Sequence, residues 1–146
     1  MKKMKNILIA NGVNLDLLGT REPEIYGTQT LADLEKKLRK NQGCTLEFFQ
    51  TNSEESFLSK ITGPWDAVII NPGAWTHTSL ALSDRIKGLP FPFVEVHLSH
   101  LFTREAIRQV SLTAGSCIGF ICGFGLDGYA AALELLVSHL IKKHGA

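Results

Sequence analysis

The stretch NILIAN, residues 6–11, is a short apolar run that ends at a turn signal, Asn11-Gly12. Short apolar runs bounded by turn residues are typical of strands buried in a parallel sheet. Leu31, Leu34 and Leu38 then recur at helical spacing. The chain is therefore expected to alternate strands with helices. Four further stretches are expected to form strands, at 44–49, 66–71, 91–98 and 116–122.

Helices are expected between and after these strands, at 30–40, 53–61, 76–87, 103–109 and 126–143. Thr30 is expected to cap the first helix, Ser53 the second, and Thr76 or Thr78 the third. Five strands with helical crossovers predict an α/β fold with an all-parallel sheet covered on both faces. The length of 146 residues favours a single domain over 1–146, a flavodoxin-like doubly wound five-stranded parallel sheet with strand order 2-1-3-4-5.

The charge balance excludes several broad classes of protein. Fifteen Lys and Arg against fourteen Asp and Glu give a net charge of +1, which argues against a general nucleic-acid binder. No apolar run approaches the roughly 20 residues that span a bilayer. The apolar stretch after the first lysines is too short for a secretion signal, so we expect a cytoplasmic protein. Cys44, Cys117 and Cys122 lack metal-type spacing and are expected to be small buried apolar residues.

In doubly wound sheets the ligand lies beyond the carboxyl ends of the strands. The segment after the first strand, residues 11–27, is long for such a connection, which usually takes about 2–6 residues. It carries Asn14, Arg21 and Tyr26. Its length fits a functional lid and a surface loop with a packed tyrosine equally well.

The third strand runs into NPGAWTHTS, residues 71–79. Asn71 and the Pro-Gly pair indicate a tight turn, and N–H groups at the following helix start could hold an anion. His77 is expected in the first helical turn, where the helix dipole disfavours its protonated form. A neutral imidazole there could hydrogen-bond a hydroxyl. Plain helix capping explains everything in this stretch except His77.

The fourth strand contains a carboxylate and a histidine two residues apart. Alternation along a strand puts Glu95, His97 and Ser99 on one face. A carboxylate placed this way can fix the orientation and tautomer of the histidine. Arg104 and Arg108, four residues apart, are expected to share a helical face; solvated surface charge is the simpler interpretation, above all for Arg104.

Three other chemistries find little support. The GFGLDG stretch, residues 123–128, matches the dinucleotide pattern but lacks the following strand and acidic residue, so it predicts only a tight strand-to-helix connection. His97 and His100 fall on different faces, which argues against a metal site. A hydrolytic triad is not expected because the chain has no G-x-S-x-G elbow.

From residue 6 to about residue 137, five motifs occur in an order that resembles the type II 3-dehydroquinate dehydratases of the shikimate pathway. That resemblance implies a flavodoxin-like fold and a lyase that converts 3-dehydroquinate to 3-dehydroshikimate through an enolate, with no metal and no organic cofactor. The motifs are NGVNLDLLGTREPEIYG (11–27), QTNSEE (50–55), INPGAWTHTS (70–79), EVHLSHLFTRE (95–105) and ICGFGLDGY (121–129).

The resemblance also implies catalytic roles. Tyr26 matches the base that removes the C2 proton, and Arg21 the residue that favours its tyrosinate. His97 matches the general acid that protonates the departing C1 hydroxyl, and Glu95 its orienting partner. Asn14 matches the residue that, with a water, stabilises the enolate. A phenol is a weak acid, so a tyrosine base near neutral pH needs positive charge to stabilise its anion.

Further positions match binding groups of the family. Asn71, the Leu98 amide and Ser99 match its carboxylate-binding groups, while His77 and Arg108 match contacts to the ring hydroxyls. Asp84 matches an aspartate that reaches the site of a neighbouring subunit, in a dodecamer built from trimers.

The chain departs from the family pattern at several positions. Val13 replaces a usual proline, which questions the rigidity of the first turn, and Trp75 could alter the wall of the ligand site or the subunit packing. Two other functions stay open: a non-catalytic module that binds a hydroxy acid, and a flavin- or nucleotide-binding relative of flavodoxin. The remaining departures are Glu55, His100, Phe102 and Thr103.

Overall fold

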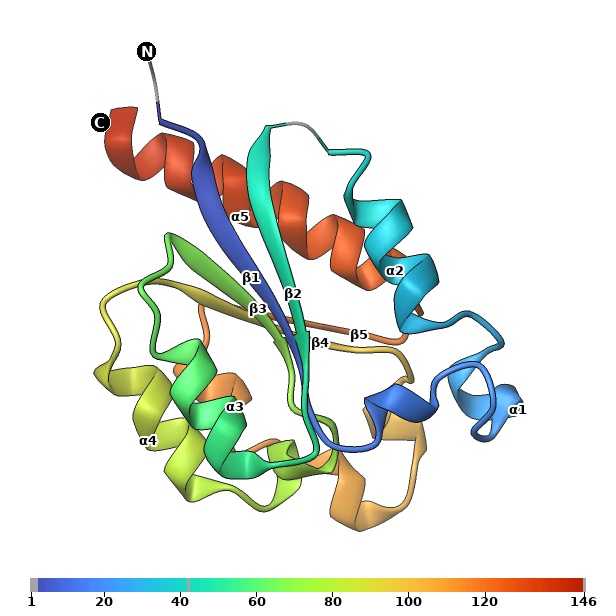
Figure 1. Ribbon diagram of the computed structural model, residues 1–146. Helices are drawn as coiled ribbons and strands as arrows, with labels where there is room; N and C mark the ends of the chain where they lie inside the picture. Colours follow the sequence, from blue (N-terminus) through green and yellow to red (C-terminus); the bar gives the residue numbers. More distant parts are fainter. Residues whose placement is uncertain (1–2, 42, 146) are drawn as a thin grey trace.

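The computed structural model describes residues 3–41 and 43–145, and a parallel sheet runs through its middle (Figure 1). The strand order is β2-β1-β3-β4-β5 and every neighbouring pair is parallel, which confirms the predicted topology. The central strands are almost continuously apolar because helices cover both faces of the sheet. The strands are β1 (Lys5–Asn11), β2 (Cys44–Gln50), β3 (Ala67–Asn71), β4 (Phe93–His97) and β5 (Gly119–Cys122).

Two layers of helices bury the two faces of the sheet. Helices α2 (Leu31–Leu38) and α5 (Asp127–Gly145) pack on one face, and α3 (Glu54–Ile61) and α4 (Leu80–Gly88) on the other (Figure 1). The short helix α1 (Pro23–Tyr26) lies beyond the carboxyl ends of the strands, at the opposite end from both termini (Figure 1). Five short 3-10 helices complete the described elements: η1 (Leu15–Leu17), η2 (Gly73–His77), η3 (Leu101–Thr103), η4 (Ala106–Gln109) and η5 (Ala114–Ser116).

The first two helix caps are confirmed. Thr30 caps α2 in a reciprocal capping box with Asp33, and the Ser53 hydroxyl accepts the Ser56 N–H at the start of α3. The predicted start of the third helix was wrong. The cap is Ser79, whose hydroxyl accepts the Leu82 N–H at 2.9 Å.

Residues 73–77 instead wind into the 3-10 helix η2, ahead of α4. Thr76 is consequently fully buried instead of capping a helix, and Thr78 follows η2. His77 ends a 3-10 turn, so the expected placement in the first turn of an α-helix, and the dipole argument built on it, do not hold.

The region between β4 and β5 also differs from the prediction. The expected helix at 103–109 is split into η3 and η4, because the backbone is extended at Arg104 and Glu105. Arg104 and Arg108 therefore do not share a helical face. The fifth strand starts at Gly119 and not at 116, because η5 takes up the preceding residues.

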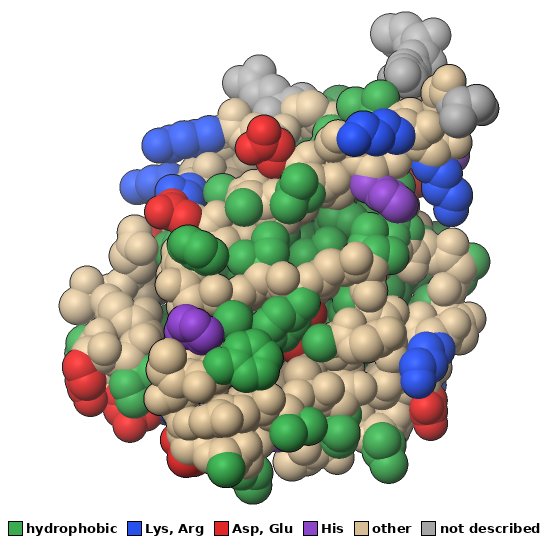
Figure 2. Space-filling view, turned by 180° about the vertical axis from the view of Figure 1, so that it is seen from behind, with side chains coloured by type: hydrophobic (Ala, Val, Ile, Leu, Met, Phe, Trp, Pro, Cys, Tyr) green, Lys and Arg blue, Asp and Glu red, His purple; other side chains and the backbone are tan. Residues whose placement is uncertain are grey.

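The edge strand β5 leaves apolar surface uncovered. All four of its residues are only partly buried, and Ile118 and Phe124 beside it are exposed. Seen from behind, the molecule shows hydrophobic side chains gathered across the middle of this face (Figure 2). Cys44 is buried as expected, whereas Cys117 and Cys122 are half-buried because they flank or belong to this thinly covered edge. Among residues 3–41 and 43–145, no helix combines the length and apolarity that a membrane span requires.

Candidate active site

Two turns at the carboxyl ends of β1 and β3 form the floor of a pocket. The Gly12 N–H donates to the Asn71 carbonyl at 2.8 Å, and a Cβ on Gly12 would lie 2.5 Å from the Pro72 oxygen. Gly73 has a φ of +61°, and a Cβ there would lie 2.7 Å from the Val13 oxygen. Both positions therefore require glycine. Val13, which departs from the family pattern, lies inside this tight contact.

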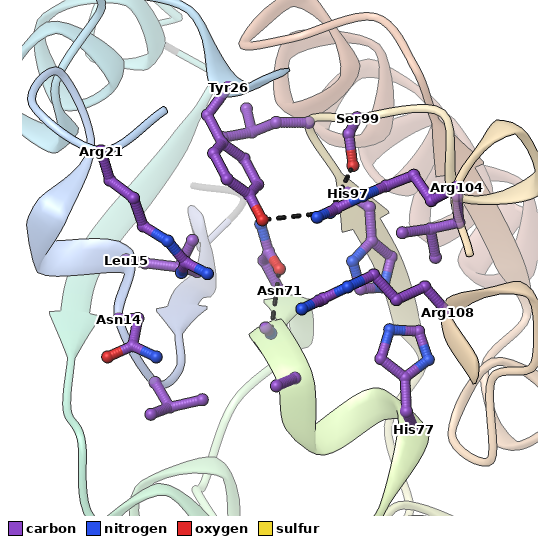
Figure 3. Close-up of a pocket in the computed structure, with 15 residues that line it drawn as sticks. Asn14, Leu15, Arg21, Tyr26, Asn71, His77, His97, Ser99, Arg104 and Arg108 are labelled. Carbon is purple, nitrogen blue, oxygen red and sulfur yellow. Dashed lines mark hydrogen bonds between the residues drawn. The ribbon is translucent and has the colours of Figure 1, made fainter. Parts of the chain in front are cut away.

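The pocket gathers most of the predicted residues from four separate segments (Figure 3). It encloses about 40 Å³ of free space, which is room for a few waters. Glu95 lies behind His97 with no exposed surface, and Asp84 is exposed on α4, away from this pocket. The predicted residues that line it are Asn14, Arg21, Tyr26, Asn71, His77, His97, Leu98, Ser99 and Arg108.

The phenol of Tyr26 lies between two guanidinium groups, Arg21 on one side and Arg104 on the other (Figure 3). Their central carbons are 5.1 Å and 5.3 Å from the ring centroid. Arg104 Nη1 also donates to the Tyr26 hydroxyl at 3.0 Å and to Ser99 Oγ at 3.3 Å. Two permanent cations from different segments therefore converge on one phenol.

Arg104 is a site residue that the sequence interpretation missed. The expectation of solvated surface charge was wrong, because the extended backbone after η3 turns its side chain into the pocket. The available signal was its position in the same motif as His97 and Ser99, close behind the strand end. The expected helical pairing with Arg108 obscured that signal.

Glu95 and His97 form a buried pair on β4. Glu95 Oε2 lies 2.7 Å from His97 Nε2. A carboxylate oxygen only accepts, so Nε2 carries a hydrogen, and Nδ1 is the ring nitrogen that can exchange a proton with a ligand. Burial by itself raises the pKa of Glu95, but hydrogen bonds from His97, Thr113 and Thr76 and the charge of His97 outweigh it and hold the pKa below its usual value.

His77 is held in one tautomer by a backbone carbonyl. Its Nδ1 lies 2.7 Å from the Val110 oxygen and must therefore donate, so in a neutral ring Nε2 is an acceptor. This contact, and not a helix dipole, leaves Nε2 of the neutral His77 ring able to accept a hydrogen bond from a hydroxyl. Beside it, Arg108 pairs through Nε with Glu105 at 2.6 Å.

Asn71 is positioned from behind by a tyrosine. Its Nδ2 donates to the Tyr129 hydroxyl at 2.8 Å, and that hydroxyl donates to Asn11 Oδ1 at 2.6 Å. Its Oδ1 accepts the Gly73 N–H at 3.1 Å. Tyr129 is fully buried, and burial raises its pKa well above the usual value despite the hydrogen bond from Asn71. The second Nδ2 hydrogen of Asn71 is then the group it can offer to a ligand.

Trp75 does not form part of the pocket wall. It packs in the apolar layer on the α3 side of the sheet, with its ring centroid 5.5 Å from that of Phe57. Trp75 therefore does not line the ligand site, although its ring lies against Gly12 of the pocket floor. Within the described ranges, no group of three or more His, Cys, Asp or Glu side chains is arranged to hold a metal ion.

Residues 5–137 match the profile of a family described as "Dehydroquinase class II". The chain belongs to this family. A 3-dehydroquinate dehydratase of Actinobacillus pleuropneumoniae serotype 5b is 47% identical over 95% of this chain and 94% of its own length. One of Carboxydothermus hydrogenoformans is 48% identical over 94% and 93%.

Solved structures of class II dehydroquinases show the same architecture. The type II dehydroquinase of Butyrivibrio crossotus superposes with a TM-score of 0.88 at 36% identity, covering 91% of this chain and 97% of that one. That of Propionibacterium acnes gives 0.84 at 39% identity, covering 94% and 99%. These findings confirm the resemblance drawn from the sequence motifs and the class II dehydroquinase fold.

Proposed function

We propose that the chain dehydrates 3-dehydroquinate to 3-dehydroshikimate through an enolate, as a type II dehydratase that uses neither metal nor organic cofactor. One observation in the structure supports the proposal in addition to the family membership. A phenol flanked by two guanidinium groups lies in the same pocket as a carboxylate-oriented imidazole. Loss of water next to a ketone needs a base for the C2 proton and an acid for the C1 hydroxyl.

Tyr26 is the proposed base. The carbon acid is weak, so the base must be a strong one, and a tyrosinate meets that need once its charge is stabilised. Arg21 and Arg104 supply the stabilising charge from two different segments. Asn14, which lines the same pocket, is proposed to hold with a water the oxygen on which enolate charge develops.

His97 is the proposed general acid. With Nε2–H committed to Glu95, protonation of Nδ1 gives an imidazolium that a buried carboxylate stabilises. The Nδ1 proton then passes to the departing C1 hydroxyl, and water leaves. Glu95 stays ionised throughout, because its pKa lies below its usual value.

The remaining pocket groups are proposed to bind the polar edge of the substrate. Asn71, Ser99 and the Leu98 amide are assigned to the carboxylate. His77 offers an acceptor at Nε2 to a ring hydroxyl, and Arg108 lies beside it. The 11–27 loop, which carries Tyr26, is assigned the role of a lid that opens to admit the substrate and closes over it.

We further propose a dodecamer, built as a tetramer of trimers, in which Asp84 completes a neighbouring site. Its exposed position on α4 and the uncovered apolar edge at β5 support an assembly. Light scattering on the purified chain should show a large particle. A fully active monomer would contradict the role assigned to Asp84.

The direct test is to add 3-dehydroquinate to purified protein and follow the ultraviolet absorbance of the conjugated product. Product formation is expected to persist with a metal chelator present. Tight calorimetric binding of the substrate without product would instead identify a non-catalytic binding module. Bound flavin or nucleotide in the purified protein would point to a different ligand class.

A further inference from the structure

Three hydroxyl groups surround the buried carboxylate of Glu95. Thr76 Oγ1 donates to Glu95 Oε2 at 2.6 Å and Ser111 Oγ lies 3.1 Å from the same oxygen. Thr113 Oγ1 makes a short hydrogen bond to the other oxygen, Oε1. Thr76, Thr113 and Glu95 have no exposed surface at all, and the three hydroxyls lie within 3.3 Å of one another. We call Thr76, Ser111 and Thr113 the hydroxyl cage.

Counting hydrogens shows how this cluster can satisfy the carboxylate. Each hydroxyl has one hydrogen, and Ser111 Oγ already accepts the Ala114 N–H at 2.9 Å. If Thr76 and Thr113 give their hydrogens to Glu95, Ser111 can give its own to Thr76 or to Glu95, and every donor is used. An ionised Glu95 can accept from these hydroxyls and from His97 Nε2–H at once. A protonated Glu95 would have to give its own hydrogen to one of these groups, and the carboxyl would lose an acceptor position. The arrangement therefore favours an ionised carboxylate.

We infer that Thr76, Ser111 and Thr113 are positioning residues that keep Glu95 ionised and share its charge, and that they thereby set how readily His97 releases its proton. The inference rests on the proposed function for its catalytic consequence. Donors on a carboxylate draw charge away from it, so it holds the imidazolium proton less tightly. Without the cage, Glu95 would hold that proton more strongly and His97 would be a weaker acid.

The cage also ties the acid to the hydroxyl-binding side of the pocket. The Leu112 N–H donates to the Thr76 carbonyl at 2.7 Å, and the Val110 carbonyl accepts from His77 Nδ1 at 2.7 Å. One segment, residues 110–113, therefore contacts both η2 and the Glu95 carboxylate. A displaced cage would be expected to disturb His77 together with His97.

Other charged groups also face the pair and are unchanged by cage substitutions. The pocket side presents Tyr26, His77 and the arginines 21, 104 and 108 to His97. Behind Glu95 lies Cys117, a thiol whose pKa is raised above its usual value by burial and then by the Glu95 charge, so it stays neutral. A change in pH dependence on removing one cage hydroxyl can therefore be assigned to the cage.

The test compares Thr113→Val, which keeps the shape and removes the donor, with Thr113→Ser, which keeps the donor. In Thr113→Val we expect kcat to fall about ten- to a hundredfold, as for loss of a hydrogen bond to a charged group, with a smaller change in KM. The alkaline limb of the kcat profile should move to higher pH. Thr113→Ser should restore both. Thr62→Val, which removes a hydroxyl at the end of α3, is the matched control and should leave both unchanged.

A second readout needs no substrate. The proton NMR signal of His97 Nε2–H is expected to move downfield in Thr113→Val, because the bond to Glu95 strengthens, and to return in Thr113→Ser. If wild type makes no product while this signal still follows the cage, the proposed function fails and the positioning inference stands. An active wild type whose Thr113→Val variant keeps its NMR signal and its pH profile, with only a lower melting temperature, overturns the inference.

Ser111→Ala covers the case in which Thr113→Val does not fold. Ser111 is only partly buried and lies farther from Glu95, so its removal is milder. We expect a several-fold loss of kcat, as for the loss of about one hydrogen bond, and the alkaline limb of the kcat profile should again move to higher pH. An unchanged profile in this variant would also overturn the inference.

Discussion

The two tyrosines of the chain serve the pocket from opposite sides and in opposite surroundings. Tyr26 lies on α1, in a segment of mostly exposed residues, with guanidinium groups on both sides of its ring. Tyr129 lies fully buried in the first turn of α5, between the amides of Asn71 and Asn11. Two cations face the first phenol, which is the proposed base, whereas burial raises the pKa of the second and keeps it a neutral hydrogen-bond relay. The surroundings, and not the residue type, therefore distinguish the two tyrosines.

The same phenylalanine substitution at the two tyrosines gives the sharpest form of this comparison. Tyr26→Phe removes the proposed base, and turnover of 3-dehydroquinate should fall by about 10²–10⁴-fold, the usual contribution of a general base. Because its hydroxyl bonds, among residues 3–41 and 43–145, to the Arg104 side chain alone, the melting temperature should change little. Steady-state assays with a thermal melt measure both. Unchanged turnover in this variant would remove Tyr26 from the mechanism.

Arg104→Gln tests whether the charge around Tyr26 makes the difference. The variant loses the charge at Tyr26 and the Nη1 group that donates to both Tyr26 and Ser99, so kcat should drop about ten- to a hundredfold. Arg104→Lys keeps a positive charge and should retain more activity than Arg104→Gln. Arg39→Gln is the control, since Arg39 is exposed and its contacts with Glu35 and the Phe48 ring lie away from the pocket. Equal losses in the two variants would show that the guanidinium beside Tyr26 has no special role.

The buried sheet and the 11–27 loop also differ in how much of their structure can be predicted from the sequence. The buried sheet follows from apolar runs such as 6–11, because burial on both faces demands them whatever the function. Glu95 and His97 were paired correctly, since alternation along a strand fixes which side chains lie on one face. The roles of Arg21 and Tyr26 came only from the family resemblance, because a long loop has no periodicity to read.

The errors in the sequence interpretation share one physical cause. Short 3-10 turns at η2, η3 and η4 replaced expected α-helices, and each change redirected side chains. Arg104 turned into the pocket and Thr76 turned under Glu95 as a result. Tertiary hydrogen bonds, such as Leu112 N–H to the Thr76 carbonyl, select these turns, and they join residues far apart in the sequence. Helical spacing contains no information about such contacts.

Tyr129→Phe should reverse the pattern of Tyr26→Phe. Loss of its hydroxyl leaves the amides of Asn71 and Asn11 without their shared partner, so the free energy of unfolding should fall by about 1–3 kcal/mol. Asn71 then loses its fixed orientation, and KM should rise several-fold, about one neutral hydrogen bond, with kcat nearly unchanged. A large fall in kcat with an unchanged melting temperature would mean that both tyrosines act in the chemistry.

The smallest expected effect concerns how the free energy of unfolding depends on pH. It extends the comparison to the buried carboxylate of Glu95. Glu95 has a folded pKa below its ordinary value of 4.5, so its ionised form stabilises the fold above that value, and the contribution is lost as pH falls through the folded pKa. Glu95→Gln cannot titrate there. The gap in unfolding free energy between wild type and Glu95→Gln should therefore be widest near neutral pH and should narrow below pH 4.5. Urea unfolding of both proteins across that range measures the gap. Glu55→Gln, at an exposed position on α3, is the control that shows the effect of removing a solvent-exposed carboxylate. A gap that widens on acidification would mean that Glu95 is protonated in the folded protein, and desolvation would then govern this carboxylate as it governs Tyr129.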